Sequence, residues 1–276
     1  MTDIQGRTAF ITGGGNGIGL GIARSFARAG AKLALADIDA AALARAKAEL
    51  QDITPVETFT LDVRDRDAYA STAEAVERAL GPVTLLFNNA GVAGGNSLMK
   101  INYELWDWYL GINLYGVING LQTFLPKMVK LGQGGHIVNT ASGAGLVATG
   151  AGVLYTTSKF AVVGLSEELN INSELKSAGI GVSVLCPARV ATDIVQRSVD
   201  ATPRSGVKLP EEVEKKIAEN IALAGQMLHQ YGVSIDVVGE MVLKAVLENS
   251  PYILTDRETE ALIKARTKAI LEAMPD

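Results

Sequence analysis

Tyr155 and Lys159 have residue types and a spacing that suit acid–base chemistry. They stand four positions apart at the start of an expected helix, so their side chains lie on the same face. A free tyrosine titrates near pH ~10, and a fixed ammonium nearby favours the phenolate and lowers the phenol pKa. Tyr155 is therefore suited to exchange a proton with an alcohol near neutral pH. Because such pairs also arise by chance on solvated helix faces, the surrounding residues have to support this interpretation.

Two further polar segments follow the ends of expected strands. Ser142 stands 13 residues before Tyr155, just past one strand, and Asn88-Asn89-Ala90-Gly91 follows the strand before it. The carboxyl ends of parallel strands form the ligand crevice of open α/β sheets, so Ser142 should face a bound cofactor. The small and amide-bearing residues of the second segment can pack close to a ribose and bond to neighbouring backbone.

A glycine-rich turn, Thr12-Gly13-Gly14-Gly15-Asn16-Gly17-Ile18-Gly19, separates the first expected strand from the first helix. Gly13, Gly17 and Gly19 would let the backbone turn sharply and approach a pyrophosphate without Cβ clashes. The helix that follows supplies free N–H groups and a positive dipole end for the anion. The sequence has no G-x-x-x-x-G-K-[ST] motif, which excludes a P-loop NTPase.

Asp37 ends the second expected strand, 18 residues after Gly19. An acidic residue there can accept hydrogen bonds from an adenosine ribose, and its charge repels the 2′-phosphate of NADP. The sequence therefore predicts NAD rather than NADP. The alternative is that Asp37 caps the next helix, a role that Asp39 can fill instead.

Short apolar runs alternate with amphipathic segments, which predicts a doubly wound parallel sheet of the Rossmann type with helices on both faces. We expect one domain over residues 1–276. The expected strands are 8–12, 33–36, 56–61, 83–87, 136–140 and 181–185, and the expected helices run from the glycine turn to about 29, then 40–50, 65–80, 103–130 and 154–177.

The alternation stops at Pro187, and helical periodicity resumes at Glu211. A long irregular segment in a compact domain is more often functional than idle, although a disordered insertion is an alternative. We expect a substrate loop or lid over about residues 187–230, part of which could instead be an amphipathic helix that covers the core. A helical tail is expected over about 256–274, packed on its own subunit or on a neighbour.

Taken together, these motifs resemble those of the short-chain dehydrogenase/reductase family over about residues 7–187. The residues that carry the resemblance are the turn 12–19, Asn88-Asn89-Ala90-Gly91, Asn113, Ser142, Tyr155 and Lys159. The resemblance implies a sheet of about seven strands, a nicotinamide cofactor, and hydride transfer between that cofactor and a secondary alcohol or ketone. One departure is Pro187-Ala188, where the family usually has Pro-Gly, because alanine does not readily adopt positive φ.

The resemblance also implies a role for each matching residue. Tyr155 would be the general acid/base, Lys159 would hold the nicotinamide ribose and lower the tyrosine pKa, and Ser142 would bond the substrate oxygen. Asn113 would anchor a water that links Lys159 to solvent. Asp62-Val63 matches the pair that contacts adenine, and Thr192 matches the residue that bonds the carboxamide. The implied dinucleotide contacts are Gly13, Asn16, Gly17, Ile18, Gly19, Asp37, Asp62, Val63, Asn89, Ala90, Gly91, Tyr155, Lys159, Pro187, Val190 and Thr192.

The expected lid is rich in apolar residues, which favours a bulky lipophilic or aryl alcohol over a sugar or a charged acid. A narrower similarity, in the segments 116–120, 135–138 and 179–184 and around Tyr252-Ile253, is to bacterial Cα-dehydrogenases that oxidise benzylic alcohols of lignin-type aryl ethers. Two alternatives remain. One is a 3-oxoacyl carrier-protein reductase-like enzyme, and the other is a regulator that senses NAD without catalysis.

Composition limits the other possibilities. The net charge is −5 and no dense basic run occurs, which argues against a nucleic-acid partner. Two histidines and the lone Cys186 are too few for a zinc site, so we expect no metal. The first residues lack the pattern of a secretory signal and no apolar stretch is long enough for a membrane span, which leads us to expect a cytoplasmic protein. The apolar excess of the long helices, together with the resemblance, implies a homodimer or homotetramer.

Overall fold

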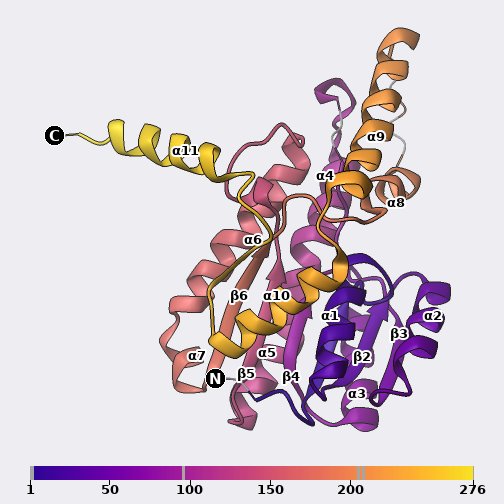
Figure 1. Ribbon diagram of the computed structural model, residues 1–276, viewed down its shortest axis with the longest axis vertical. Helices are drawn as coiled ribbons and strands as arrows, with labels where there is room; N and C mark the ends of the chain where they lie inside the picture. The colour runs from indigo at the N-terminus through magenta and orange to yellow at the C-terminus, as the bar shows by residue number, and fades with distance from the viewer. Residues whose placement is uncertain (1–2, 95–96, 204–205, 207–208, 276) are drawn as a thin grey trace.

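The computed structural model describes residues 3–94, 97–203, 206 and 209–275, which form one seven-stranded parallel sheet (Figure 1). The strand order is β3-β2-β1-β4-β5-β6-β7. The chain therefore winds outward from β1 to β3, returns to the other side of β1, and winds outward again to β7. The predicted doubly wound fold is confirmed, and its switch point lies between β1 and β4. The strands are β1 (Thr8–Thr12), β2 (Lys32–Asp37), β3 (Val56–Thr60), β4 (Val83–Asn88), β5 (Gly135–Thr140), β6 (Ile180–Cys186) and β7 (Tyr252–Leu254).

Helices cover both faces of this sheet, and adjacent strand residues face opposite layers. Ile11 packs with α1, α2 and α10, whereas its neighbour Phe10 packs with α3, α5 and α6. This period of two explains why the central strands are apolar along their whole length. The helices are α1 (Gly17–Arg28), α2 (Ala40–Leu50), α3 (Arg66–Leu80), α4 (Tyr103–Leu110), α5 (Gly116–Leu131), α6 (Val153–Ile171), α7 (Ser173–Ser177), α8 (Ile194–Ala201), α9 (Glu211–Tyr231), α10 (Ile235–Glu248) and α11 (Glu260–Glu272).

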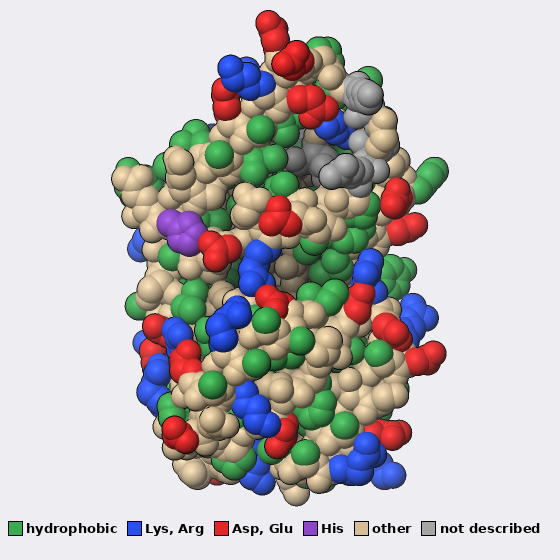
Figure 2. All heavy atoms as spheres, turned by 90° about the vertical axis from the view of Figure 1, so that its right-hand side faces the viewer, with side chains coloured by type: hydrophobic (Ala, Val, Ile, Leu, Met, Phe, Trp, Pro, Cys, Tyr) green, Lys and Arg blue, Asp and Glu red, His purple; other side chains and the backbone are tan. Residues whose placement is uncertain are grey.

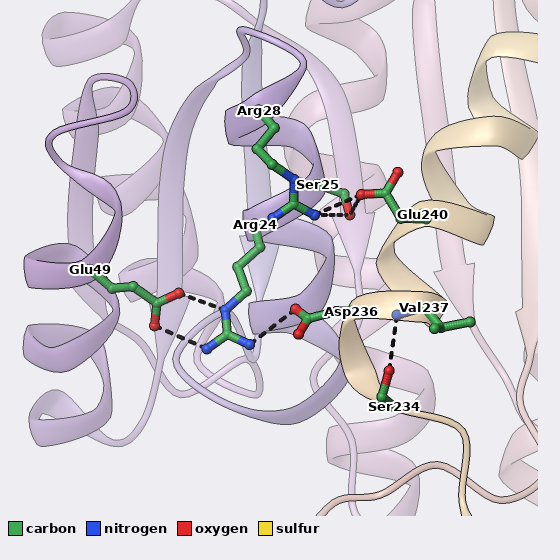
Figure 3. Close-up of polar contacts among 8 residues, drawn as sticks. All are labelled: Arg24, Ser25, Arg28, Glu49, Ser234, Asp236, Val237 and Glu240. Atoms are coloured by element: carbon green, nitrogen blue, oxygen red, sulfur yellow. Dashed lines mark hydrogen bonds and ion pairs between the residues drawn. The ribbon is translucent and has the colours of Figure 1, made fainter.

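Helix α1, which carries the glycine turn at its start, is fixed by a close crossing with α10. A Cβ on Gly21 would lie 2.0 Å from the Ile235 carbonyl oxygen, and one on Gly239 would lie 2.2 Å from the Gly21 oxygen. Polar contacts flank the crossing (Figure 3): Arg24 bonds Glu49 at 2.6 Å and Asp236 at 3.0 Å. The two glycines let the backbones touch, and Arg24 joins α1 to both neighbouring helices.

Two long helices expected from the sequence are interrupted. The segment 103–130 contains a π-helical stretch, Gly111–Tyr115, between α4 and α5. The segment 154–177 breaks at Asn172, whose side chain caps α7 by accepting hydrogen bonds from Glu174 and Leu175. The sequence prediction merged these elements because apolar periodicity continues across both interruptions, whereas a π-bulge is decided by local packing.

The segment after β6 is more ordered than expected. Residues 187–210 were predicted to lack regular structure, but α8 forms within them, while α9 begins at Glu211 as predicted. Helix α8 is only eight residues long and ends before Pro203, so its periodicity is too short to stand out.

Helices α9 and α11 project from the body of the molecule (Figure 1). Neither helix has a buried residue among those described. Helix α11 contacts its own subunit through Arg266, whose guanidinium lies 5.3 Å from the Phe160 ring centroid. None of the described helices has the length and apolarity to cross a membrane.

Candidate active site

The glycine turn joins β1 to α1 beside the switch point of the sheet. Gly13 and Gly17 have φ of 64° and 50°, so both need glycine. Gly19 is required for a different reason, since a Cβ there would lie 2.1 Å from the Gly13 carbonyl oxygen. Two glycines thus shape the turn and the third lets α1 pack closely against it.

The two acidic residues at the end of β2 and just past it have different roles. Asp39 is the N-cap of α2 and accepts a hydrogen bond from the Ala42 N–H at 2.9 Å. Asp37 caps no helix; its carboxylate accepts from the N–H groups of Gly15 and Asp39, each at 3.0 Å. The alternative role of Asp37 as a helix cap is therefore wrong, and Asp37 lies directly beside the glycine turn.

The ends of β1 and β4 are tied together through Thr12. Its hydroxyl oxygen accepts hydrogen bonds from the N–H groups of Asn89 at 2.9 Å and Ala90 at 3.0 Å. The Asn89 amide in turn donates to the Thr12 carbonyl oxygen at 3.0 Å. Thr12 belongs to the predicted glycine-rich turn, but this link to β4 was not predicted from the sequence.

Tyr155, Lys159 and Ser142 converge at the carboxyl ends of β5 and β6. Tyr155 and Lys159 occupy successive turns of α6, and the Lys159 Nζ lies 5.8 Å from the Tyr155 ring centroid. Lys159 is 3% exposed and donates a hydrogen bond to the Thr140 carbonyl oxygen at 3.0 Å. Ser142, two residues past the end of β5, has its hydroxyl near enough to Tyr155 to favour the phenolate, and its Oγ donates to the Pro187 carbonyl oxygen at 3.5 Å. The structure therefore brings together the three side chains expected to act on a substrate oxygen.

Burial dominates the electrostatics of this cluster. It raises the pKa of Tyr155, and the nearby Ser142 hydroxyl opposes that effect. It lowers the pKa of Lys159 to about 8 and raises that of the Cys186 thiol to about 12. The lowering of the Tyr155 pKa expected from Lys159 is therefore not seen in the free protein, where burial raises this pKa. The phenol carries its proton at neutral pH, as a general acid does, and Cys186 is a buried thiol.

Asn113 lies in the π-helical stretch and is fully buried. Its amide accepts from the Val92 N–H at 2.8 Å and donates to the Val92 carbonyl at 3.0 Å, which fixes the loop after β4. It also donates to Ser158 Oγ at 3.0 Å, and Ser158 donates to the Tyr155 carbonyl at 2.7 Å. Asn113 thus links the loop at Gly91 to the helix that carries Tyr155, and Ser158 is a positioning residue that the sequence analysis did not single out.

The loop after β6 is fixed by contacts with distant segments. The Ala188 N–H donates to Thr255 Oγ1 at 3.1 Å, and the Pro187 carbonyl accepts from the Gly143 N–H at 2.9 Å. Asn249 is the one non-glycine residue with positive φ in the described part of the chain, so Ala188 replaces the usual glycine without strain. Val190 is buried and forms a β-bridge with Val233.

Thr192, expected from the resemblance to bond the carboxamide, lies over the glycine turn. A Cβ on Gly17 would be 3.2 Å from the Thr192 Cγ2. Asp62 and Val63, expected from the resemblance to contact adenine, follow β3 at the edge of the sheet. Both carboxylate oxygens of Asp62 bond Arg64, which lowers the Asp62 pKa, and Val63 packs against Gly116.

These residues fit a dinucleotide. The N-cap of α1, Asn16, makes no side-chain hydrogen bond to the first turn, so the cap leaves those N–H groups free for an anion. Gly91 keeps the approach to Lys159 clear, because a Cβ there would lie 3.4 Å from Lys159 Nζ. Asp37 supplies an acceptor beside the turn. No cluster of potential metal ligands occurs among the described residues.

An aromatic cluster lies next to Tyr155. Leu105, Trp108 and Tyr109 of α4 pack with Leu154, and Val92 and Tyr155 pack against this group. The Trp108 and Tyr109 rings meet edge to face with centroids 4.9 Å apart. One wall beside the phenol is therefore apolar and aromatic.

Comparisons with known proteins agree with this geometry. The family model described as short chain dehydrogenase matches residues 7–203. A C alpha-dehydrogenase from Sphingobium sp. strain SYK-6 is 36% identical over 276 residues, which cover 99% of this chain and 88% of the relative. Retinol dehydrogenase 10 from Xenopus tropicalis is 34% identical over 73% of this chain and 53% of its own. A short-chain dehydrogenase/reductase from Burkholderia phymatum, solved in complex with NAD, superimposes with a TM-score of 0.91 at 33% identity and covers 100% of this chain and 98% of its own.

The buried ammonium of Lys159 should lower the free energy of unfolding of the protein. Its pKa of about 8 lies below the value of about 10.4 expected in the unfolded chain. The unfolded state therefore binds more protons between these values, and the free energy of unfolding rises with pH across this range. We predict that Lys159→Met is more stable than wild type at pH 7 by about 1–2 kcal/mol, because it removes the desolvated charge. The loss of the hydrogen bond to the Thr140 carbonyl offsets part of the gain. The gain should shrink as the pH rises from 8 towards 10.4.

Urea unfolding at several pH values measures this difference. Lys47→Met, which removes an exposed lysine paired with Glu57, is the matched control and should change stability by less than about 0.5 kcal/mol. A Lys159→Met protein that is less stable than wild type at pH 7 would contradict the assignment of a costly buried charge.

Proposed function

This chain belongs to the short-chain dehydrogenase family, and we propose that it is an NAD-dependent oxidoreductase that interconverts a secondary alcohol and its ketone. The observation that carries the proposal is the convergence of Tyr155, Ser142 and Lys159 beside the glycine turn. These groups provide a proton donor, a hydroxyl partner and a cation at one edge of the sheet. A dinucleotide, when bound, supplies the acceptor or donor of the hydride.

Tyr155 moves the proton in this proposal. In ketone reduction its protonated phenol donates to the substrate oxygen, and in alcohol oxidation the phenolate accepts the hydroxyl proton. Ser142 orients the substrate oxygen through its hydroxyl, which lies near Tyr155. Lys159, already desolvated, favours the phenolate when its ammonium is charged and is proposed to bond the nicotinamide ribose.

Asn113 is proposed to position the loop after β4 and the helix that carries Tyr155. Its amide is used by Val92 and Ser158, so a water link between Lys159 and solvent would depend on the main chain of the π-helical stretch and not on this amide. Such π-bulges are often found at functional sites.

NAD is proposed as the cofactor over NADP. Asp37 places a carboxylate beside Gly15, where it would bond the adenosine ribose and repel a 2′-phosphate. The NAD complex of the Burkholderia phymatum relative supports the choice. The proposed dinucleotide contacts are those that the sequence analysis names, with Val190 contributing through its main chain because its side chain is in the core.

A bulky lipophilic or aryl carbinol is the proposed substrate class. The aromatic wall of α4 lies next to Tyr155, and an aromatic ring stacks well against such a surface. The similarity to a C alpha-dehydrogenase over nearly the whole chain and to a retinol dehydrogenase over part of it supports an apolar alcohol.

The two alternatives fit the structure less well. A 3-oxoacyl carrier-protein reductase would usually prefer NADPH, which Asp37 opposes. A regulator that only senses NAD would not need Tyr155, Ser142 and Lys159 in one cluster.

We also propose a cytoplasmic homodimer or homotetramer. Helices α5 and α6 keep exposed apolar side chains, such as Val129 and Ile171, that a partner subunit could cover. Helix α11 likewise exposes Leu262, Ile270 and Leu271.

Tyr155→Phe should lower kcat by at least about a thousandfold, because it removes the hydroxyl that exchanges the proton. NADH affinity, measured by fluorescence titration, should stay within about threefold of wild type. Tyr252→Phe, which removes a hydroxyl bonded to Glu167 on the surface, is the matched control and should keep normal turnover. Near-normal activity of Tyr155→Phe would refute the assignment.

Cofactor preference tests the role of Asp37. The wild-type kcat/KM with NADH should exceed that with NADPH at least about tenfold, since the carboxylate repels the extra phosphate. Asp37→Ser should narrow this ratio, whereas Asp52→Ser, an exposed carboxylate away from the turn, should not. Equal use of both cofactors by the wild type would contradict the prediction.

A panel of alcohols assayed with NAD tests the substrate class. We expect aryl carbinols to be oxidised with the highest kcat/KM, lipophilic alcohols such as steroids next, and small polyols least. Trp108→Ala should reduce the advantage of aryl over aliphatic alcohols about tenfold by opening the aromatic wall. Activity confined to small polyols would rule out the proposed class.

A further inference from the structure

The segment around α8 crosses in front of the glycine turn. Thr192 lies over Gly17, as described above. Ser198, only 2% exposed, accepts a hydrogen bond from the Ala93 N–H at 2.8 Å, which attaches α8 to the loop after β4. The expected lid thus contacts both loops that border the switch point, and Figure 2 shows a hollow and charged side chains of both signs on this side of the molecule.

Arg197 extends from α8 to the starts of two other helices. Its Nη2 donates to Asp39 Oδ2 at 3.1 Å, an ion pair whose side chains are 46% and 31% exposed. The amide oxygen of Asn16, in the orientation that satisfies both groups, accepts from Arg197 at 3.0 and 3.2 Å. One guanidinium therefore joins the lid to the N-caps of α1 and α2.

The charge pattern around this contact is unusual for a helix start. The first turn of α1 has no acidic residue, and its N-cap makes no side-chain hydrogen bond. A guanidinium beside the positive end of a helix is unfavourable unless an anion lies near both. Asp39 is the anion that pairs with Arg197 here, but it also caps α2. The nearby Asp37 bonds two backbone N–H groups.

We propose that Arg197 is a cofactor-positioning residue that couples lid closure to binding of the dinucleotide diphosphate. Without cofactor, Arg197 holds α8 closed through Asp39. With cofactor, the guanidinium and the first turn of α1 share the diphosphate, so binding itself keeps the lid closed. This inference depends on the proposed function because it needs a dinucleotide in the groove.

Binding of NADH, ADP-ribose and adenosine to the full chain tests the diphosphate contact. Arg197→Met should weaken the affinity for NADH and for ADP-ribose about tenfold or more, chiefly through faster dissociation measured by stopped flow. Its affinity for adenosine should stay within about twofold of wild type. The affinity of Arg197→Lys for NADH and ADP-ribose should lie between those of wild type and Arg197→Met, because lysine keeps the charge but lacks the planar guanidinium. Arg28→Met, which removes an arginine paired with Glu240 elsewhere on α1, is the matched control and should bind all three normally.

Cleavage of the lid by thermolysin, which cuts before the Ile and Val residues of α8, tests the coupling with and without NADH and does not depend on turnover. Asp39→Asn keeps the cap on α2 but loses the charge, so its lid should be cut faster without NADH and be protected again with NADH. Arg197→Met should be cut fast in both states, and Arg28→Met slowly in both. Unfolding curves confirm that each variant is folded.

The outcomes separate this inference from the proposed function. If the wild type binds NADH and Arg197→Met binds it equally well, or is protected by it equally well, the role of Arg197 is wrong and the proposed function stands. Equal weakening of adenosine and ADP-ribose would overturn the diphosphate contact. A wild type that binds neither NADH nor ADP-ribose would overturn both proposals.

Discussion

The hydrogen bonds that the Thr12 hydroxyl accepts from the main chain of Asn89 and Ala90 join the ends of β1 and β4, where the winding of the sheet reverses. The glycine turn leaves β1 on one side of this junction, and the loop held by Asn113 leaves β4 on the other. Because all the strands are parallel, the next two strands end at the same edge with Ser142 and Pro187. A shift of this junction would separate the cofactor turn from the catalytic cluster.

The catalytic cluster combines burial with few polar partners. Lys159 gives up most of its hydration for one hydrogen bond to Thr140 in the free protein, and Tyr155 is held as a neutral phenol. Such an arrangement reduces stability, as is common where function needs a desolvated charge. In return, little solvent has to reorganise around the reacting oxygen when a substrate approaches. The π-helical stretch at Asn113 also serves the site. It directs the Asn113 amide towards the loop after β4, where the amide donates to the Val92 carbonyl.

The lid is attached differently from the rest of the fold. Among the described residues, α8 buries Ser198 alone and α9 buries none, so few apolar contacts hold this region to the body. Its attachments to the body are polar contacts with distant segments: Ser198 to Ala93, Arg197 to Asp39, and Glu214 to Lys100. Segments with little buried apolar surface open at low free-energy cost. The base of the lid is firmer, since Val190 is buried and bridges to Val233.

Local pattern was enough to predict the alternating strands and helices, the parallel sheet, and the pairing of Tyr155 with Lys159 on one face of α6. Glycine spacing, strand apolarity and helical periodicity depend on near neighbours in the chain, so the sequence carries them directly. Packing between distant segments decided the rest. The roles of Gly19, Ser158 and Arg197, the break at Asn113 and the direction of the Tyr155 pKa depend on which backbone or charge lies nearby. Desolvation and steric contact arise only when the chain is folded, and so the sequence could show which residues were available but not which neighbours they would meet.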